Sequence, residues 1–165
     1  MVQVSIVMGS KSDLGVMENC MDMLKEFEIG YEVRILSAHR TPVESHEYAV
    51  GLRERGIKVV IAAAGGAAHL AGVIAGTTTL PVIGVPIETK ALGGMDSLLS
   101  IVQMPKGIPV ATVAIGKAGA ANAAILAAQI LGVSDHVMAE KMSEYKKTMA
   151  SKVLADTDVE TYMGK

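Results

Sequence analysis

Aromatic residues are scarce in this sequence, which has one Phe, four Tyr and no Trp among its 165 residues. A surface that stacks the bases of single-stranded nucleic acid needs more aromatic side chains than this. An excess of charge of one sign is also lacking, because 15 basic and 17 acidic residues leave a net charge of −2. Without a basic surface, we expect no nucleic-acid partner.

Cysteine occurs once, at Cys20, so the chain can form neither an internal disulfide nor a metal site built from several cysteines. This usage suits a reducing compartment. Cys20 falls on the apolar stripe of a predicted helix, and we interpret it as a core residue rather than a nucleophile. His39 and His69 do not combine with Cys20 in a metal-site spacing, and we predict no metal.

A long uncharged run extends from Val59 to Ile87, yet it does not predict a membrane helix. Breaking residues divide it into short pieces, at Gly65, Gly66, 77–79, Pro81 and Pro86. A continuous apolar helix of about 20 residues does not fit this pattern, whereas a buried strand–helix–strand unit does. The first eight residues carry no basic segment typical of a signal peptide. We therefore expect a cytoplasmic protein with no membrane partner.

Short apolar runs alternate with segments of helical periodicity along the chain. The runs predict strands at 2–8, 31–36, 59–64, 81–85 and 110–115. The periodic segments predict helices at 14–27 (stopped by Gly30), 42–55, 67–75, 96–102, 118–131 and 134–155. This alternation indicates a doubly wound α/β fold, a three-layer, parallel, flavodoxin-like sheet with an extra C-terminal helix. Its switch point would lie between the first and third strands.

We divide the chain into an α/β domain at 1–132 and a helical extension at 133–165. The helix at 118–131 is apolar on every side, which predicts a subunit contact, because an outer helix of a small domain should have a wet face. The last helix carries an apolar stripe, made of Met138, Met142, Tyr145, Met149 and Val153. The stripe can pack on its own domain or on a neighbouring subunit, and the pattern leaves both open.

Three polar loops each follow a predicted strand and precede a predicted helix. Their sequences are GSKSD at 9–13, SAHRT at 37–41 and GGAAH at 65–69. In an open parallel sheet such loops gather at the carboxyl edge, where these folds bind ligands. Together they supply hydroxyls for a phosphate, a carboxylate for a sugar, an arginine and two histidines. This set of groups suits acid–base chemistry on a phosphorylated small molecule.

The first loop places a glycine-containing turn at a helix N-terminus, where backbone N–H groups and the helix dipole favour an anion. Ser10 and Ser12 add hydroxyl donors, and Asp13 can accept hydrogen bonds from ribose hydroxyls. The alternative is that Ser12 or Asp13 only caps the helix. The loop is neither a P-loop nor a G-x-G-x-x-G motif, so nothing here favours ATP or NAD.

In the second loop, Arg40 can clamp a phosphate and His39 can exchange protons near neutral pH. The alternative for His39 is a solvated surface side chain. Thr41, Pro42 and Glu44 predict the start of the next helix, with Thr41 as its cap and Glu44 completing a capping box.

The third loop follows the most buried of the predicted strands. Gly65 and Gly66 let a ligand approach the backbone closely, and the next helix offers further N–H donors. His69 stands among small apolar residues, which allows either a core histidine or a ligand-facing group.

The strings MGSKSD at 8–13, SAHRTP at 37–42 and AGGAAHL at 64–70, taken together, resemble the PurE family of purine biosynthesis. The resemblance covers about residues 2–132 and includes AIGKAGAAN at 114–122. One branch of that family moves a carboxylate from the exocyclic nitrogen of N5-carboxyaminoimidazole ribonucleotide to ring carbon C4. Arg40 after His39, and the third loop, are similar to this mutase branch.

The resemblance also implies roles for individual residues. Ser10, Ser37 and Arg40 would hold the 5′-phosphate beside Ser12, and Asp13 would hold the ribose. The third loop would surround the base and the migrating carboxylate, through Gly65, Gly66, Ala67, His69 and Leu70. His39 would be the general acid and base, and the reaction would need no cofactor. The family's assembly implies a homo-octamer.

Two alternatives remain open on the sequence. The nearest is a direct carboxylase, which would add CO2 to aminoimidazole ribonucleotide. The other is a non-catalytic flavodoxin-like binding module. A receiver module would need an Asp after the third strand, where this chain has Ala64 and Gly65, and a flavin carrier usually stacks its flavin on aromatics.

Overall fold

The computed structural model describes residues 1–156, and residues 157–165 of the predicted extension lie outside this described part. Five parallel strands form one sheet in the order β2-β1-β3-β4-β5. They are β1 (Val2–Met8), β2 (Gly30–Ile35), β3 (Val59–Gly65), β4 (Val82–Ile87) and β5 (Ala111–Thr112). The strand order reverses between β1 and β3, which confirms the predicted flavodoxin-like arrangement and its switch point.

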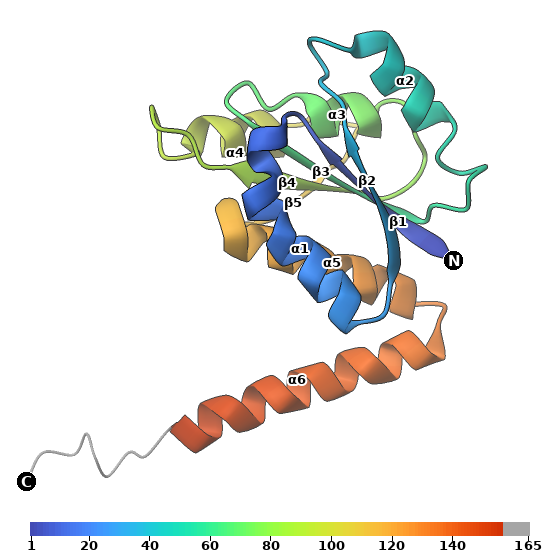
Figure 1. Cartoon of the computed structure of the whole chain (residues 1–165), viewed down its shortest axis with the longest axis vertical. Helices are drawn as coiled ribbons and strands as arrows, with labels where there is room; N and C mark the ends of the chain where they lie inside the picture. The colour runs from blue at the N-terminus through green and yellow to red at the C-terminus, as the bar shows by residue number, and fades with distance from the viewer. Residues whose placement is uncertain (157–165) are drawn as a thin grey trace, which may run out of the picture.

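Helices cover both faces of the sheet (Figure 1). One face carries α1 (Leu14–Glu26) and α5 (Gly116–Gly132), with the short 3₁₀ helix η1 (Lys11–Asp13) before α1, and α6 (His136–Asp156) packs on α5 outside this layer (Figure 1). The other carries α2 (Pro42–Val50), α3 (Leu70–Ala75) and α4 (Met95–Val102). Within residues 1–156, none of these helices has the length and apolarity needed to cross a bilayer.

The central strand β3 separates two hydrophobic cores. Its side chains alternate, so that Ile61 and Ala63 face α1 and α5 while Val60 and Ala62 face α3. All four are fully buried, as expected for a parallel strand covered on both faces. Next to it in β4, a Cβ on Gly84 would come within 2.4 Å of an Ile101 methyl of α4. The missing side chain therefore lets α4 pack close to the sheet, beside the ends of β3 and β4.

Two helix ends differ from the sequence prediction. The helix α1 ends at Glu26, and Gly30, predicted as its stop, instead begins β2. Glu28 makes the reversal with a left-handed φ of 58°, a conformation that propensity does not assign to glutamate. The helix α2 ends at Val50 rather than Arg55, because residues 51–56 form turns.

Three further predictions around the loops are also corrected. Thr41 occupies the N-cap position of α2, but its side chain makes no capping bond, so the predicted capping box with Glu44 is wrong. The helix α3 begins at Leu70, three residues after the predicted start, because residues 66–69 form a non-helical loop. The fifth strand has only two residues, where six were predicted.

The apolar helix α5 is buried between α1 and α6 of the same chain (Figure 1). Its fully buried residues are Ala120, Ala123, Ala124, Ala127 and Ala128. Small side chains allow the close approach of α1, and the polar side chains of the helix, Lys117, Asn122 and Gln129, are exposed. Much of the apolar surface that predicted a subunit contact is therefore covered within one chain.

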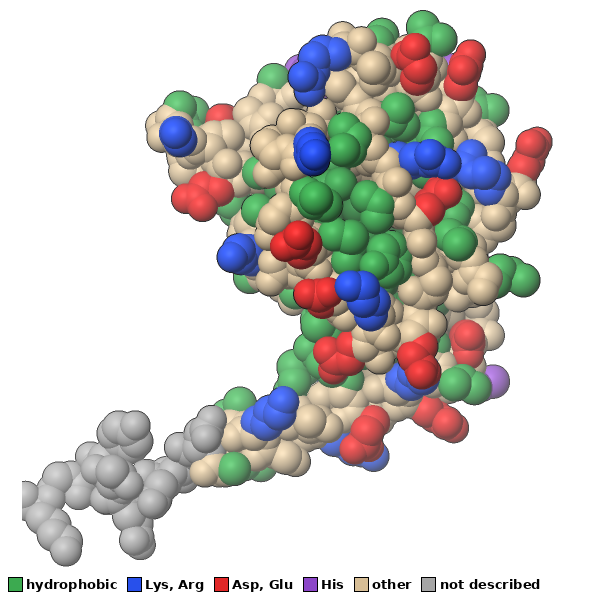
Figure 2. Space-filling model, viewed as in Figure 1, with side chains coloured by type: hydrophobic (Ala, Val, Ile, Leu, Met, Phe, Trp, Pro, Cys, Tyr) green, Lys and Arg blue, Asp and Glu red, His purple; other side chains and the backbone are tan. Residues whose placement is uncertain are grey.

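The stripe on α6 divides into two halves. Met138 and Met142 are buried in the core, and the Tyr145 ring meets the edge of Phe27 at 5.2 Å between centroids. Farther along, Met149 is 43% exposed where α6 extends away from the body (Figure 1). Figure 2 shows acidic and basic side chains interspersed along this helix and over the visible face. The first half of the stripe thus packs on its own domain.

A polar cluster lies at the β2 edge of the sheet, and we call it the edge cluster. Its members are Ser5, Glu32, Tyr48 and Arg55. The buried Ser5 hydroxyl is 2.7 Å from the Tyr48 hydroxyl, which donates in turn to Glu32. Arg55 donates to the same carboxylate at 3.2 Å and lies over the Tyr48 ring at 4.5 Å. These contacts join β1 and β2 to α2 and the turn that follows it.

Candidate active site

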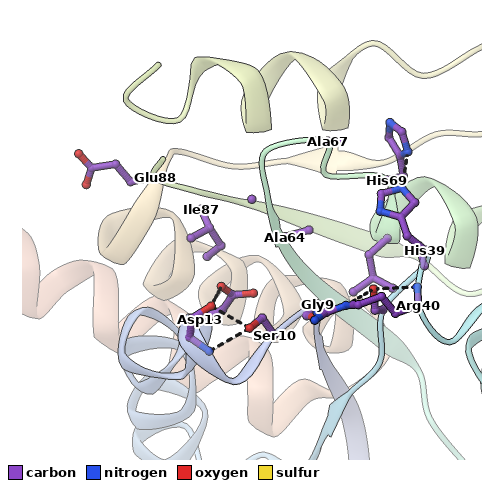
Figure 3. Close-up of a pocket in the computed structure, with 15 residues that line it drawn as sticks. Gly9, Ser10, Asp13, His39, Arg40, Ala64, Ala67, His69, Ile87 and Glu88 are labelled. Carbon is purple, nitrogen blue, oxygen red and sulfur yellow. Dashed lines mark hydrogen bonds between the residues drawn. The ribbon is translucent and has the colours of Figure 1, made fainter. Parts of the chain in front are cut away.

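The loops that follow β1, β2 and β3 meet at the carboxyl edge of the sheet and line a cavity of about 550 Å³ (Figure 3). This volume lies in the range of small-molecule sites, and its position at the switch point is the one expected for this fold. The lining residues are Gly9, Ser10, Ser12, Asp13, Ser37, Ala38, His39, Arg40, Ala64, Gly65, Ala67, His69, Leu70, Ile87 and Glu88.

Every predicted site residue except Gly66 lies on this cavity. Gly66 stands behind the lining, between Gly65 and Ala67. Sequence reasoning missed Ile87 and Glu88, which end β4 and begin the next loop. The same rule that identified the other loops, that ligands bind beyond the carboxyl ends of parallel strands, would have found them. This loop begins with Glu88, Thr89 and Lys90 and lacks there the glycines and serines that mark the first three.

The first loop is an internally bonded turn. The Ser10 hydroxyl accepts from the Ser12 N–H at 3.2 Å and caps η1, so the capping role falls to Ser10. The Ser12 hydroxyl lies 2.9 Å from Ser10 Oγ and 3.1 Å from Asp13 Oδ1. Asp13 is 7% exposed, and burial raises the pKa of its carboxyl despite hydrogen bonds from Ser12 and Ser10 that lower it. A polar ligand that bonds to Asp13 would relieve this desolvation.

The second loop is closed by Thr41, whose hydroxyl accepts from the Ser37 N–H at 2.8 Å and donates to the Ser37 carbonyl at 3.0 Å. This bond explains why Thr41 does not cap α2. Arg40 then crosses to the first loop. Its Nε donates to Ser37 Oγ at 3.3 Å and its guanidinium donates to the Gly9 carbonyl at 2.9 Å (Figure 3). Since Arg40 is exposed, its remaining donors are accessible to an anion.

His39 and His69 face each other across the second and third loops (Figure 3). His39 Nε2 lies 2.8 Å from His69 Nδ1, and the rings meet edge to face at 4.8 Å between centroids. One nitrogen of this contact donates and the other accepts, so the contact admits only one proton between the rings. Both side chains are exposed on the cavity. The pair can therefore pass a proton to or from a bound molecule.

Charge is distributed unevenly around the cavity (Figure 3). Arg40 and the two histidines lie on the β2 side, whereas Asp13 and Glu88 lie toward α1 and the loop after β4. A ligand with an anionic end and a hydroxyl-rich middle matches this division, because carboxylates accept from hydroxyls and guanidinium donates to anions.

The remaining candidate, Cys20, is fully buried on α1, as expected for a core residue. Burial raises the pKa of its thiol to about 12, so the reactive thiolate is suppressed. Over residues 1–156, no three His, Cys, Asp or Glu side chains gather in a metal-binding arrangement.

Comparison with known proteins gives one family for nearly the whole chain. The family model described as AIR carboxylase matches residues 3–152. A Bacillus subtilis protein named N5-carboxyaminoimidazole ribonucleotide mutase is 58% identical over 155 residues, covering 94% of this chain and 96% of the relative. A Pyrococcus horikoshii protein of the same name is 60% identical over 150 residues, covering 91% and 84%.

The fold comparison agrees with the sequence comparison. The crystal structure of Treponema denticola PurE superimposes with a TM-score of 0.86 at 30% identity, over the whole of both chains. The architecture that carries the cavity is therefore shared with a solved structure.

Proposed function

This chain belongs to the AIR carboxylase family, and from that membership we propose that it is an N5-carboxyaminoimidazole ribonucleotide mutase of purine biosynthesis. The reaction moves a carboxylate from the exocyclic nitrogen to ring carbon C4 and yields 4-carboxy-5-aminoimidazole ribonucleotide. Relatives that carry the mutase name match most of the chain at more than half identity. This favours the mutase over a direct CO2 carboxylase and over a non-catalytic binding module.

The single observation that carries the proposal is that one cavity holds both an exposed arginine and an exposed histidine pair. In the proposed complex, Arg40, Ser37 and Ser10 bind the 5′-phosphate, with Ser12 beside them. Asp13 accepts hydrogen bonds from the ribose hydroxyls. The imidazole ring then lies between His39 and the small residues of the third loop, Gly65 and Ala67.

The first chemical step releases CO2. His39 donates a proton to the exocyclic nitrogen as the bond from that nitrogen to the carboxylate carbon breaks. The products in the cavity are aminoimidazole ribonucleotide and CO2, and His39 is left neutral. General acid catalysis of this kind contributes about 10²–10⁴-fold to the rate.

The second step captures the same CO2 at C4. The electron-rich ring carbon attacks CO2, a carbon–carbon bond forms, and neutral His39 removes the C4 proton so that the ring becomes aromatic again. The proton count balances, because the proton lost in the first step returns to His39 in the second. No metal, redox cofactor or ATP takes part in either step.

His69 has a supporting role in this scheme. Its Nδ1 is within hydrogen-bond distance of His39 Nε2, so it can orient the His39 ring and accept or return its proton. Leu70 closes the wall beside it, where a small apolar lining keeps water from the reacting atoms.

We also propose that the chain works as a homo-oligomer, an octamer as the family resemblance implies, in the cytoplasm. Support comes from α6, where apolar Met149 is 43% and Leu154 is 74% exposed. Sedimentation of the full chain and of a Met149→Glu variant tests this, and a wild-type monomer would reject it.

The function is tested by offering the purified chain two substrates separately. With N5-carboxyaminoimidazole ribonucleotide we expect rapid formation of the 4-carboxy product, which NMR detects. With aminoimidazole ribonucleotide and dilute bicarbonate we expect little of this product. Equal rates from the two would favour the direct carboxylase, and conversion of neither would favour a binding module.

A further inference from the structure

Gly66 is held from behind by two serines on one face of α4. Its N–H donates to Ser97 Oγ at 2.9 Å, and its carbonyl accepts from Ser100 Oγ at 3.2 Å. Its φ is +70°, in the left-handed region that favours glycine. The residues on either side, Gly65 and Ala67, line the cavity although Gly66 does not. The two serines therefore hydrogen-bond to the third loop on its side away from the cavity.

Ser97 has the stronger hold of the two. It is fully buried, and its hydroxyl donates to the Ile87 carbonyl at 2.6 Å. Since a hydroxyl has one proton, Ser97 then meets Gly66 as an acceptor. Gly65 and Ile87 are register partners at the ends of β3 and β4. One side chain thus joins two cavity-lining segments just beyond the point where the strand ladder stops.

Ser100 contributes less, because its one hydroxyl proton is shared between the Gly66 carbonyl and the closer Asp96 carbonyl, which lies 2.6 Å away. The start of α4 is itself anchored to the loop after β4, where Thr89 Oγ1 donates to Asp96 Oδ1 at 2.7 Å. The two serines are therefore presented by a helix whose position is fixed at its N-terminus.

The orientation of Gly66 determines what the loop shows to the cavity. In a planar trans peptide, the carbonyl and the next N–H point in opposite directions. Because the Gly66 carbonyl points toward Ser100 and α4, the N–H of Ala67 points away from α4. Ala67 lies on the cavity, beneath α4 in Figure 3. Its N–H is therefore available as a donor to a carboxylate or to CO2.

We propose that Ser97, assisted by Ser100, is a positioning residue that fixes the third loop so that released CO2 is recaptured rather than lost. This inference rests on the proposed mutase function. After the carbon–nitrogen bond breaks, CO2 either forms its bond to C4, with the C4 proton passing to His39, or diffuses into solvent and leaves aminoimidazole ribonucleotide. A loop held in one orientation favours the first outcome, because neutral CO2 is retained by shape and placement.

The test is a single turnover of N5-carboxyaminoimidazole ribonucleotide with enzyme in excess, in buffer containing ¹³C-bicarbonate. NMR gives the fraction of 4-carboxy product that carries ¹³C from the buffer and the amount of free aminoimidazole ribonucleotide. For Ser97→Ala we expect both to rise several-fold over wild type. Its kcat should fall about 10- to 100-fold, as expected for a small misplacement of reacting groups. KM should change little, since the phosphate site is untouched.

Tyr48→Phe is the matched control, because it also removes one hydrogen-bonded hydroxyl, here a half-buried one, but lies in the edge cluster. It should keep the wild-type ratio of recaptured to released CO2. A folded Ser97→Ala enzyme with the wild-type ratio of recaptured to released CO2 would overturn the inference. If Ser97→Ala does not fold, Ser100→Ala must show the same change to a smaller degree. A wild-type ratio of recaptured to released CO2 in Ser100→Ala would then contradict the inference. If wild type itself converts no carbamate, the proposed function has failed instead.

Discussion

Two clusters of hydrogen-bonded polar side chains lie on this sheet, and they differ in what their groups bond to. In the edge cluster, the carboxylate of Glu32 accepts from both Tyr48 and Arg55, and Tyr48 and Glu32 are partly buried while Arg55 is exposed. At the cavity, Arg40 bonds to a backbone carbonyl and a serine, and His39 bonds to His69, while all three side chains are exposed.

The difference shows in the charges. Tyr48 has its pKa raised to about 12 by burial and by its bond to Glu32, so it stays a neutral donor. Burial alone would raise the pKa of Glu32, but bonds from Tyr48 and Arg55 outweigh it and hold the pKa below its ordinary value. The Tyr48 hydroxyl and the Glu32 carboxylate are thus bonded to each other and to neighbours within the cluster. The cavity groups have donors to spare, which is what a binding site requires. We therefore assign the edge cluster to stability and the cavity to function.

The largest expected effect is on turnover. Replacing His39 with Asn removes the proton donor while keeping a similar shape, so kcat should fall about 10²–10⁴-fold. Nucleotide binding and thermal unfolding should match wild type, because His39 is exposed and, within residues 1–156, its side chain is hydrogen-bonded to His69 alone. Steady-state kinetics with product-binding titration checks this. Near-normal turnover would contradict the assignment of the acid and base.

The two arginines give a matched pair. Arg40→Met should raise KM about 10- to 100-fold, because a hydrogen bond to a charged group contributes about 1.5–3 kcal/mol. Arg55→Met should leave KM unchanged and lower the free energy of unfolding. Steady-state kinetics and denaturant unfolding of both variants test the contrast between the cavity and the edge cluster. The contrast would be wrong if Arg55→Met raised KM as much as Arg40→Met.

Tyr48→Phe should lower the free energy of unfolding by about 1–2 kcal/mol with no change in kcat. It should also change the response to acid. Because the folded state lowers the pKa of Glu32, this carboxylate stabilises the protein above its unfolded pKa, and the stabilisation is lost as the pH falls through the folded value. Urea unfolding at neutral and acidic pH should show a smaller acid loss in the variant than in wild type. An unchanged acid loss would exclude the coupling.

The smallest effect is expected at Asp13. The folded state raises the pKa of Asp13, so its contribution to stability is present at low pH and is lost as the pH rises through the folded value. Asp13→Asn should therefore stabilise the fold by about 0.5 kcal/mol at neutral pH, while binding the nucleotide more weakly. The gain in unfolding free energy should shrink on acidification. A gain that is independent of pH would contradict this account of the carboxylate.

The sequence allowed the strand order, the switch point and the three loops to be predicted, because each signal is local. Apolar runs ended by Gly9 or by Gly65 and Gly66 give the strand ends, and topology then brings them together. What escaped prediction depends on contacts between distant residues. Thr41 bonds to Ser37 instead of capping α2, since that bond closes the loop.

The same reason explains the other misses. Glu28 adopts a left-handed turn that its residue type does not suggest, and Gly30 joins a strand next to β1. Ser97 looks like an ordinary helix residue until α4 is seen behind Gly66. No local pattern predicts that a serine will hydrogen-bond to a loop 31 residues earlier in the chain.

The most direct measurement of the central claim is a crystal structure of the enzyme with the 4-carboxy product bound. We predict the phosphate on Arg40, Ser37 and Ser10, and a His39 nitrogen about 3–3.5 Å from C4. A phosphate bound elsewhere, with C4 out of reach of both His39 and His69, would contradict the account.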